Sequence, residues 1–189
     1  MAIKKAKAFP TPAILPYMKL LNAVKSDDQT RYFMCECYYD ADEGDYGAVV
    51  ATDGRRLAVW RLSEGAIEAL TGTTEKLPSG YVILDEKRQE LRPSKLDAQF
   101  PMWRKVVPQS SELESAPFPM LRDALSASVK WAAINGICFN PLYIVDIPCN
   151  DATIVNVHKG DVKAKKAFTI STSAYCGDLL VVVMPLTLD

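Results

Sequence analysis

The sequence has only one histidine, His158, and nine glycines, and this scarcity removes the usual residues of several enzyme classes. It contains no G-x-S-x-G nucleophile motif, no H-E-x-x-H metal motif and no glycine-rich phosphate loop. His158 lies in VNVHKGD at the end of an expected strand, where a surface histidine is the simplest interpretation. We therefore expect no enzyme and no catalytic residue.

Long apolar runs are also missing. The longest, LLVVVMPL near the C-terminus, is far shorter than the roughly 20 residues that a membrane helix needs. The N-terminal segment AIKKAKAF has no apolar signal-peptide core. These absences predict a cytoplasmic protein without membrane contact.

Cysteines are few and scattered, and the charges nearly balance. Of the five cysteines only Cys35 and Cys37 are close in sequence, as a C-x-C pair. This spacing predicts neither a disulfide framework nor a zinc site, and we expect no metal and no other cofactor. The chain has 22 basic and 23 acidic residues, which disfavours a protein whose whole surface binds phosphate.

The first part of the chain reads as one helix followed by strands. Pro16 precedes YMKLLNAVK, whose apolar residues have helical spacing. Aromatic-rich residues 31–41 are expected to form a strand, and residues 46–62 a hairpin around Thr-Asp-Gly. Residues 63–79 read as a linker with one short helical patch, and two further strands are expected within 80–97.

The second part repeats this order. Residues 117–134 have the apolar spacing of an amphipathic helix, and a brief helix is expected from Asn140 to Pro148. Three β-rich runs follow, over 152–160, 162–172 and 178–188. A helix-then-strands unit that occurs twice predicts an α+β fold with mostly antiparallel sheets.

Five segments resemble, in the same order, segments of the bacterial DNA polymerase III beta subunit, the DNA sliding clamp. They are RYFMCECYY at 31–39, VVATDGRRLAVWRL at 49–62, FPMWRKVVP at 100–108, FNPLYIVDI at 139–147 and VVVMPLTL at 181–188. The string T-D-G-basic-R-L-A in the second segment is the most specific of them. The resemblance implies a DNA-clamp-like α+β fold built from repeated helix-plus-antiparallel-strands units.

The resemblance also implies how the chain is divided. Residues 1–108 are similar to the start of clamp domain two with its connector, and residues 109–189 to the end of clamp domain three. No segment resembles the clamp's first domain. We expect the two halves to form one compact domain together.

In the resembled family, a pocket between these two regions captures short peptides of DNA polymerases and other clamp-motif proteins. Carried over by position, its peptide-binding residues here would be Met34, Thr52, Gly54, Arg55, Arg56, Leu57, Pro108, Val182, Met184, Pro185 and Leu186. Apolar walls, adaptable methionines and an arginine at the rim suit such a groove. Alternatively, Val182 and Met184 alternate on a strand as core residues do, and Gly54 serves the turn alone. The chain departs from the family in Arg55, often His there, in Leu186, often Met, and in its ending LTLD.

Clamps encircle double-stranded DNA with basic residues on their inner helices, held by diffuse attraction to phosphate. The corresponding DNA-facing residues here are Lys19, Lys25, Arg122 and Lys130. Four charges are few, and ordinary solvated helix faces would look the same. The sequence thus leaves open a reduced clamp that forms a homo-oligomeric ring, a monomeric interaction module that binds clamp partners without DNA, and an enzyme with a clamp-like fold.

Overall fold

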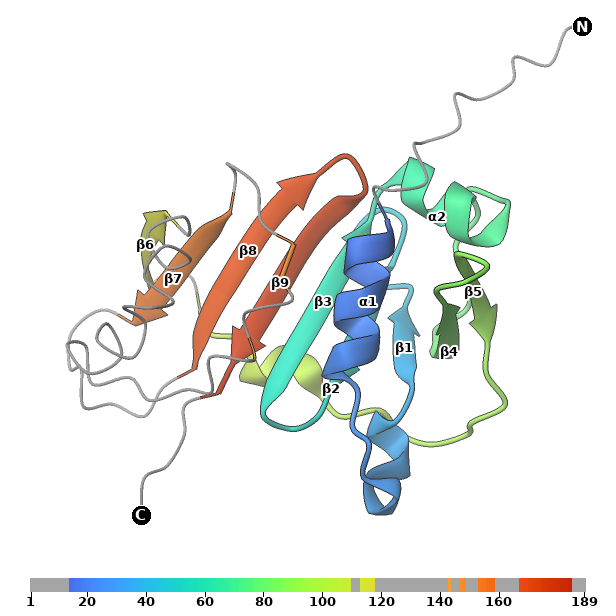
Figure 1. Cartoon of the computed structure of the whole chain (residues 1–189), viewed down its shortest axis with the longest axis horizontal. Coiled ribbons are helices and arrows are strands. Elements are labelled where there is room, and N and C mark those ends of the chain that lie inside the picture. Colours follow the sequence, from blue (N-terminus) through green and yellow to red (C-terminus); the bar gives the residue numbers. More distant parts are fainter. Residues whose placement is uncertain are drawn as a thin grey trace, which may run out of the picture.

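A computed structural model describes residues 14–109, 113–117, 143, 147–148, 153–158 and 167–184. In this part of the chain the strands form one nine-stranded sheet of order β5-β4-β1-β2-β3-β9-β8-β7-β6, and every pairing is antiparallel (Figure 1). The strands are β1 (Cys37–Asp40), β2 (Ala48–Thr52), β3 (Arg56–Leu62), β4 (Gly80–Asp85), β5 (Glu90–Pro93), β6 (Leu113–Pro117), β7 (Ile154–His158), β8 (Phe168–Ala174) and β9 (Gly177–Val183). The predicted α+β class with antiparallel strands is confirmed.

The pairing of β3 with β9 joins distant parts of the chain. It runs from Arg56 opposite Val183 to Leu62 opposite Gly177, so strands before residue 108 and strands after it share one sheet. The hydrogen bond from the Met184 N–H to the Arg55 carbonyl, 2.9 Å long, continues this pairing to the end of the β2–β3 hairpin. The predicted division at residue 108 and the formation of one domain stay predictions.

The hairpin predicted around Thr-Asp-Gly is confirmed, with Asp53, Gly54 and Arg55 between β2 and β3. Gly54 has a φ of 84°, a conformation that glycine adopts without steric cost. Asp53 Oδ1 accepts hydrogen bonds of 2.8 Å from the N–H groups of both Arg55 and Arg56. The aspartate therefore fixes the turn as an Asx turn does.

One face of the sheet is covered by helix α1 (Leu15–Val24), as the sequence predicted, and by α2 (Glu64–Thr71) (Figure 1). Tyr17, Met18, Leu20, Leu21 and Val24 of α1 are buried there. The side chain of Trp60 on β3 packs against Tyr17 at a centroid distance of 5.2 Å and donates its indole N–H to the Cys176 carbonyl. This face is a closed core.

Helix α2 replaces part of the expected linker over 63–79. Ser63 caps its first turn by accepting a hydrogen bond from the Ala66 N–H, and Gly72 ends it with a φ of 77°. The helical patch noted in the sequence is thus a complete helix with both caps. Among the described residues, no helix is long and apolar enough to cross a membrane.

The opposite face is covered by segments with little regular structure. The connector, residues 94–109, contains the 3-10 helix η3 (Trp103–Val106), and a second 3-10 helix, η2 (Gln29–Met34), lies beside it. Val50 and Val59 from the sheet pack there with Phe100 and Trp103. Because both faces of β2 are covered, its residues are all buried.

The strand expected over 31–41 is partly wrong. Residues up to Met34 form η2, and the strand begins only at Cys37. The cause is local, since the Asp28 carboxylate accepts from both the Thr30 N–H and the Thr30 hydroxyl and so begins a helical turn. Met34 therefore lies on η2, not on a strand.

In the second part, the predicted runs over 152–160, 162–172 and 178–188 correspond to β7, β8 and β9. The amphipathic helix expected over 117–134 lies outside the described residues, apart from Pro117 at the end of β6. Of the brief helix expected from Asn140, only Tyr143 and residues 147–148 are described, and Tyr143 is helical.

Candidate functional site

An apolar pocket lies on the connector face of the sheet, and its empty space together with the open solvent in front of it amounts to about 530 Å³. Its walls come from four separate segments: η2, the β2–β3 hairpin, the connector and the end of β9. The lining residues are Met34, Thr52, Gly54, Arg56, Leu57, Pro101, Met102, Trp103, Val106, Val182 and Met184.

The hairpin side of the pocket has its polar groups satisfied internally. The Thr52 hydroxyl donates to the Arg56 carbonyl at 2.8 Å and accepts from the Gly54 N–H at 3.1 Å. Leu57 is almost fully buried behind them. Thr52 therefore presents mainly its methyl group to a ligand, and this side of the pocket is suited to apolar groups.

Two adjacent arginines contact Tyr143. The Arg56 guanidinium lies 5.0 Å from the Tyr143 ring centroid, binds Asp53 Oδ2 at 3.1 Å and donates to the Ala23 carbonyl. A hydrogen bond to Tyr143 raises the pKa of Arg55, which stays fully charged. Arg56 is thus held in place by three neighbours, whereas Arg55 is exposed.

The methionines are placed by backbone contacts. Met34 is the last residue of η2, and this end of η2 is fixed by two hydrogen bonds: the Ser26 N–H donates to the Met34 carbonyl, and Tyr81 Oη donates to the Phe33 carbonyl. Met184 directly follows β9 and is held by its bond to Arg55. It is 38% exposed, although Val182 two residues earlier is fully buried.

The connector forms the wall opposite the hairpin. Trp103 and Val106 lie three residues apart on η3, and this spacing puts both on one side of a 3-10 helix. Met102 is 63% and Val106 46% exposed, whereas Trp103 is buried. Met102, Val106 and Met184 together form a rim of exposed apolar side chains around the pocket.

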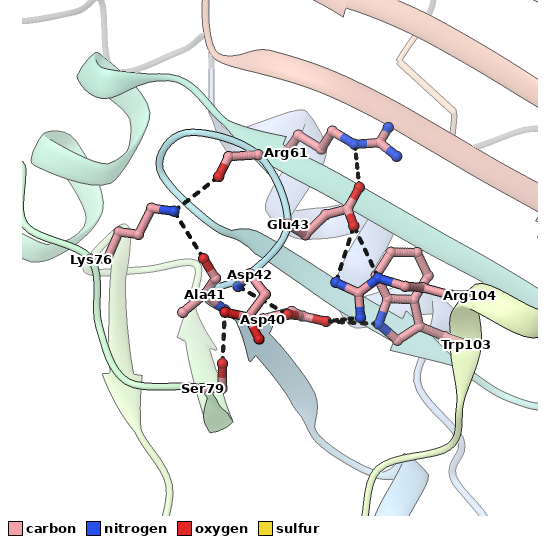
Figure 2. Close-up of polar contacts among 10 residues, drawn as sticks. Asp40, Ala41, Asp42, Glu43, Arg61, Lys76, Ser79, Trp103 and Arg104 are labelled. Carbon is pink, nitrogen blue, oxygen red and sulfur yellow. Dashed lines mark hydrogen bonds and ion pairs between the residues drawn. The ribbon is translucent and has the colours of Figure 1, made fainter.

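A polar cluster fastens this wall to the loop after β1 (Figure 2). Asp40 Oδ2 accepts a hydrogen bond from Trp103 Nε1 at 3.1 Å and is 2.8 Å from Arg104 Nη1. Glu43 Oε2 is 3.1 Å from Arg104 Nη2, and Glu43 Oε1 accepts from Arg61 Nε at 2.8 Å. The guanidinium of Arg104 also lies over the Trp103 ring at 4.5 Å.

Electrostatics in this cluster favour the ionised forms. Burial alone would raise the pKa of Asp40, but the hydrogen bonds from Arg104 and Trp103 outweigh it and the pKa is lowered. The bond to Asp40 likewise raises the pKa of Arg104. At neutral pH both groups are charged and the pair is intact.

Most of the described residues that the sequence assigned to the pocket do come together around it. Arg55 and Pro108 are described but do not line it, and Pro185 and Leu186 lie outside the described residues. Sequence reasoning missed Pro101, Met102, Trp103 and Val106. They lie in the same FPMWRKVVP segment as Pro108, and the three-residue spacing of Trp103 and Val106 was the available signal.

The residues expected to face DNA are less informative. Lys19 is exposed on α1 and is the only charged residue within this helix. Lys25, at the helix end, is half-buried, and Arg122 and Lys130 lie outside the described residues. In the part of the chain that the structure describes, no cluster of three or more histidine, cysteine, aspartate or glutamate side chains could hold a metal ion.

No family model matches the sequence, and no curated protein matches it. Solved structures do match the fold. The DNA polymerase III beta chain of Streptococcus pneumoniae aligns over 100% of this chain and 67% of its own, with 12% identity and a TM-score of 0.64. The C. crescentus beta sliding clamp aligns over 100% and 69%, with 14% identity and a TM-score of 0.63, and holds PEG at a region proposed to tether beta motifs.

A third similar structure is the sliding clamp of Bartonella birtlesii, bound to griselimycin. It aligns over 100% of this chain and 68% of its own, with 13% identity and a TM-score of 0.58. At these identities the similarity establishes the fold. The chain therefore has a clamp-like fold, as the sequence motifs predicted.

Proposed function

We propose that this protein is a non-catalytic, sliding-clamp-like recruitment or processivity factor whose pocket binds short peptide motifs of DNA polymerase or other replication and repair proteins. The observation that carries the proposal is the pocket itself. It combines the Thr-Asp-Gly hairpin with the end of β9, two segments far apart in sequence that the β3–β9 pairing brings together, and an apolar connector wall covers it. The ligands held by the C. crescentus and Bartonella clamps support a binding role for this fold.

The chemistry of the pocket defines the kind of peptide. Its polar lining groups, Thr52 and Arg56, already have partners, so the pocket favours apolar side chains. Burying one leucine or phenylalanine side chain contributes about 1.5–3 kcal/mol. Two such anchors supply about 3–6 kcal/mol, so the Kd is no tighter than about 40 µM, and the cost of ordering a flexible peptide moves it toward the millimolar range.

Fluorescence anisotropy with a labelled peptide that contains glutamine followed by leucine and phenylalanine tests the proposal. We expect saturable binding to the wild type and loss of at least about tenfold in affinity for Met184→Asp, because a charge at the mouth would be desolvated by the peptide. Ile83→Asp is the matched control. Ile83 on β4 is 41% exposed, an exposed fraction similar to the 38% of Met184, but it does not line the pocket. Equal affinities of both variants, or no binding at millimolar protein, would reject the pocket.

Encirclement of DNA by a homo-oligomer is the second part of the proposal, with Lys19, Lys25, Arg122 and Lys130 facing the duplex. One observation favours the alternative, a monomeric module that binds clamp partners away from DNA. The helix-covered face exposes Lys19 on α1, but α2 on the same face carries the exposed Glu64 and the half-exposed Glu68.

Light scattering together with retention on primed circular DNA separates the two alternatives. A ring former is expected to give a multimer at tens of micromolar and to stay on circular DNA until the DNA is cut. A strict monomer that does not bind the circle but binds the peptide would establish the interaction module.

A further inference from the structure

We infer that Asp40 is a positioning residue for the pocket, which holds the connector wall in the binding geometry through its contacts with Trp103 and Arg104. The inference rests on the proposed function, because it concerns the affinity of the same pocket. Asp40 does not line the pocket and would not touch a bound peptide. It would act through the two connector residues that it binds.

The loop that follows Asp40 is a fixed platform. Lys76 Nζ donates to the carbonyls of Ala41 at 2.9 Å and Gly44 at 3.0 Å, and Ser79 Oγ accepts from the Ala41 N–H at 2.9 Å (Figure 2). Arg61 of β3 holds Glu43 from the other side. The loop is thus bonded to the sheet and to the segment before β4. A residue that is bonded to this loop is therefore restrained in position as well.

The connector, in contrast, has little structure of its own at the wall. η3 has only four residues, Trp103–Val106, and a single turn is not stable in isolation. Side chains at its start are exposed, with Met102 63% accessible and the Arg104 side chain 51%. What fastens the turn is the packing of Trp103 and the bonds from Trp103 and Arg104 to Asp40 and Glu43.

Asp40 suits this role because one carboxylate oxygen receives two donors. Trp103 Nε1 and Arg104 Nη1 both bond to Oδ2, while Oδ1 accepts from the Asp42 N–H at 3.2 Å. In Asp40→Asn the negative charge that faces Arg104 is lost, and whichever way the amide is turned its N–H groups face a donor, either Trp103 and Arg104 or the Asp42 N–H. The substitution therefore weakens the latch, which we define as the Asp40 contacts with Trp103 and Arg104, with little change in volume.

A weaker latch would leave the fold intact. It would lower the fraction of molecules in which the connector wall has the binding geometry. Apparent affinity falls in proportion to that fraction. We expect the peptide Kd to rise roughly tenfold in Asp40→Asn, a change of about 1.4 kcal/mol. Arg104→Gln should have a similar effect. The double variant should bind the peptide about as well as the weaker-binding single variant, because both substitutions affect the same Asp40–Arg104 contact.

The wall can be observed without any peptide. The chain has three tryptophans, so fluorine NMR of protein labelled with 5-fluorotryptophan gives three signals, and Trp103→Phe identifies that of Trp103. We expect Asp40→Asn and Arg104→Gln to shift or broaden the Trp103 signal and to leave that of Trp60 in the opposite core unchanged. Asp45→Asn, an exposed aspartate of the same loop, is the control and should change neither the signal nor the affinity.

Each result decides the inference. An unchanged Trp103 signal, additive effects on the Kd, or a changed signal with unchanged affinity would overturn it. If Asp40→Asn fails to fold, Arg104→Gln alone tests the inference, because the Arg104 side chain is half-exposed and its replacement should not prevent folding. Arg104→Lys is then expected to recover part of the affinity. If the wild type binds no peptide, the proposed function fails, whereas the Trp103 signal still reports whether Asp40 holds the wall.

Discussion

The two faces of the sheet are covered in different ways. On the helix-covered face, α1 and α2 bury a continuous core in which Met18, Leu20 and Trp60 have no exposed surface. On the connector face, the connector and η2 leave Met102, Val106 and Met184 accessible around a pocket. The first face is suited to stability and the second to binding, because apolar surface left open at a concave site is available to a ligand.

The largest effect is expected on the helix-covered face. Trp60→Ala removes a fully buried ring and its hydrogen bond to the Cys176 carbonyl, and should lower the free energy of unfolding by about 3–5 kcal/mol in urea denaturation. Met102→Ala on the connector face should cost less than about 0.5 kcal/mol, since the side chain is 63% exposed. Similar costs for both would mean that the two faces do not differ in this way.

A pair of glycines tests whether the pocket depends on the hairpin backbone. Gly54 and Gly72 have φ angles of 84° and 77°, so alanine at either should cost about 1 kcal/mol of stability. An added Cβ would lie 3.2 Å from Arg31 Nη1 at Gly54 and would meet nothing within 4 Å at Gly72. Gly54→Ala alone should also weaken peptide binding in anisotropy titrations, and weakening by Gly72→Ala would contradict the assignment.

Acid should affect the latch in a defined window. The pKa of Asp40 in the folded protein lies below its ordinary value of 3.8. A carboxylate with a lowered pKa contributes stability that is present above its unfolded pKa and is lost as pH falls through the folded pKa. The free energy of unfolding of the wild type should therefore exceed that of Asp40→Asn by about 1 kcal/mol at pH 7. This difference should shrink only as the pH falls to about 3.8 and below.

Urea denaturation of both proteins at pH 7, 5 and 3 measures this difference. A difference that already disappears between pH 7 and pH 5 would show that Asp40 is not held ionised by Arg104 and Trp103.

The smallest effect is expected at Lys19. Lys19→Glu on the exposed side of α1 should change the free energy of unfolding by less than about 0.5 kcal/mol. If α1 faces DNA, the slope of log binding constant against log salt should change by about one per lost phosphate contact. An unchanged slope in filter binding at several salt concentrations would place DNA elsewhere or exclude it.

Local signals made much of the fold predictable. Asp-Gly between β-forming residues gave the hairpin, and Pro16 with its apolar spacing gave α1. Ser63 and Gly72 are ordinary cap residues, and with them α2 could have been predicted in full instead of a linker with a helical patch. The prediction of a strand over 31–41 was wrong in its first part, because the hydrogen bonds of the Asp28 side chain outweigh the β-propensity of the aromatic residues.

The pocket was predictable only where the resemblance and local geometry agreed. The hairpin residues other than Arg55 and the residues at the end of β9 do line it, but on the connector the resemblance selected Pro108 in place of Trp103 and Val106. Which side of the connector faces the sheet depends on the contacts of Trp103 and Arg104 with Asp40, which lies more than 60 positions earlier in the chain. Such pairing leaves no periodic signal in one sequence.

Methionine methyl groups test the pocket most directly. The chain has six methionines, three of which, Met34, Met102 and Met184, line the pocket, whereas Met18 is buried in the helix-covered core. In NMR spectra of protein with labelled methionine methyl groups, added peptide is expected to shift the signals of the three pocket methionines along one binding curve and to leave Met18 unchanged. Unchanged pocket signals at millimolar peptide, or shifts at Met18 instead, would contradict the account.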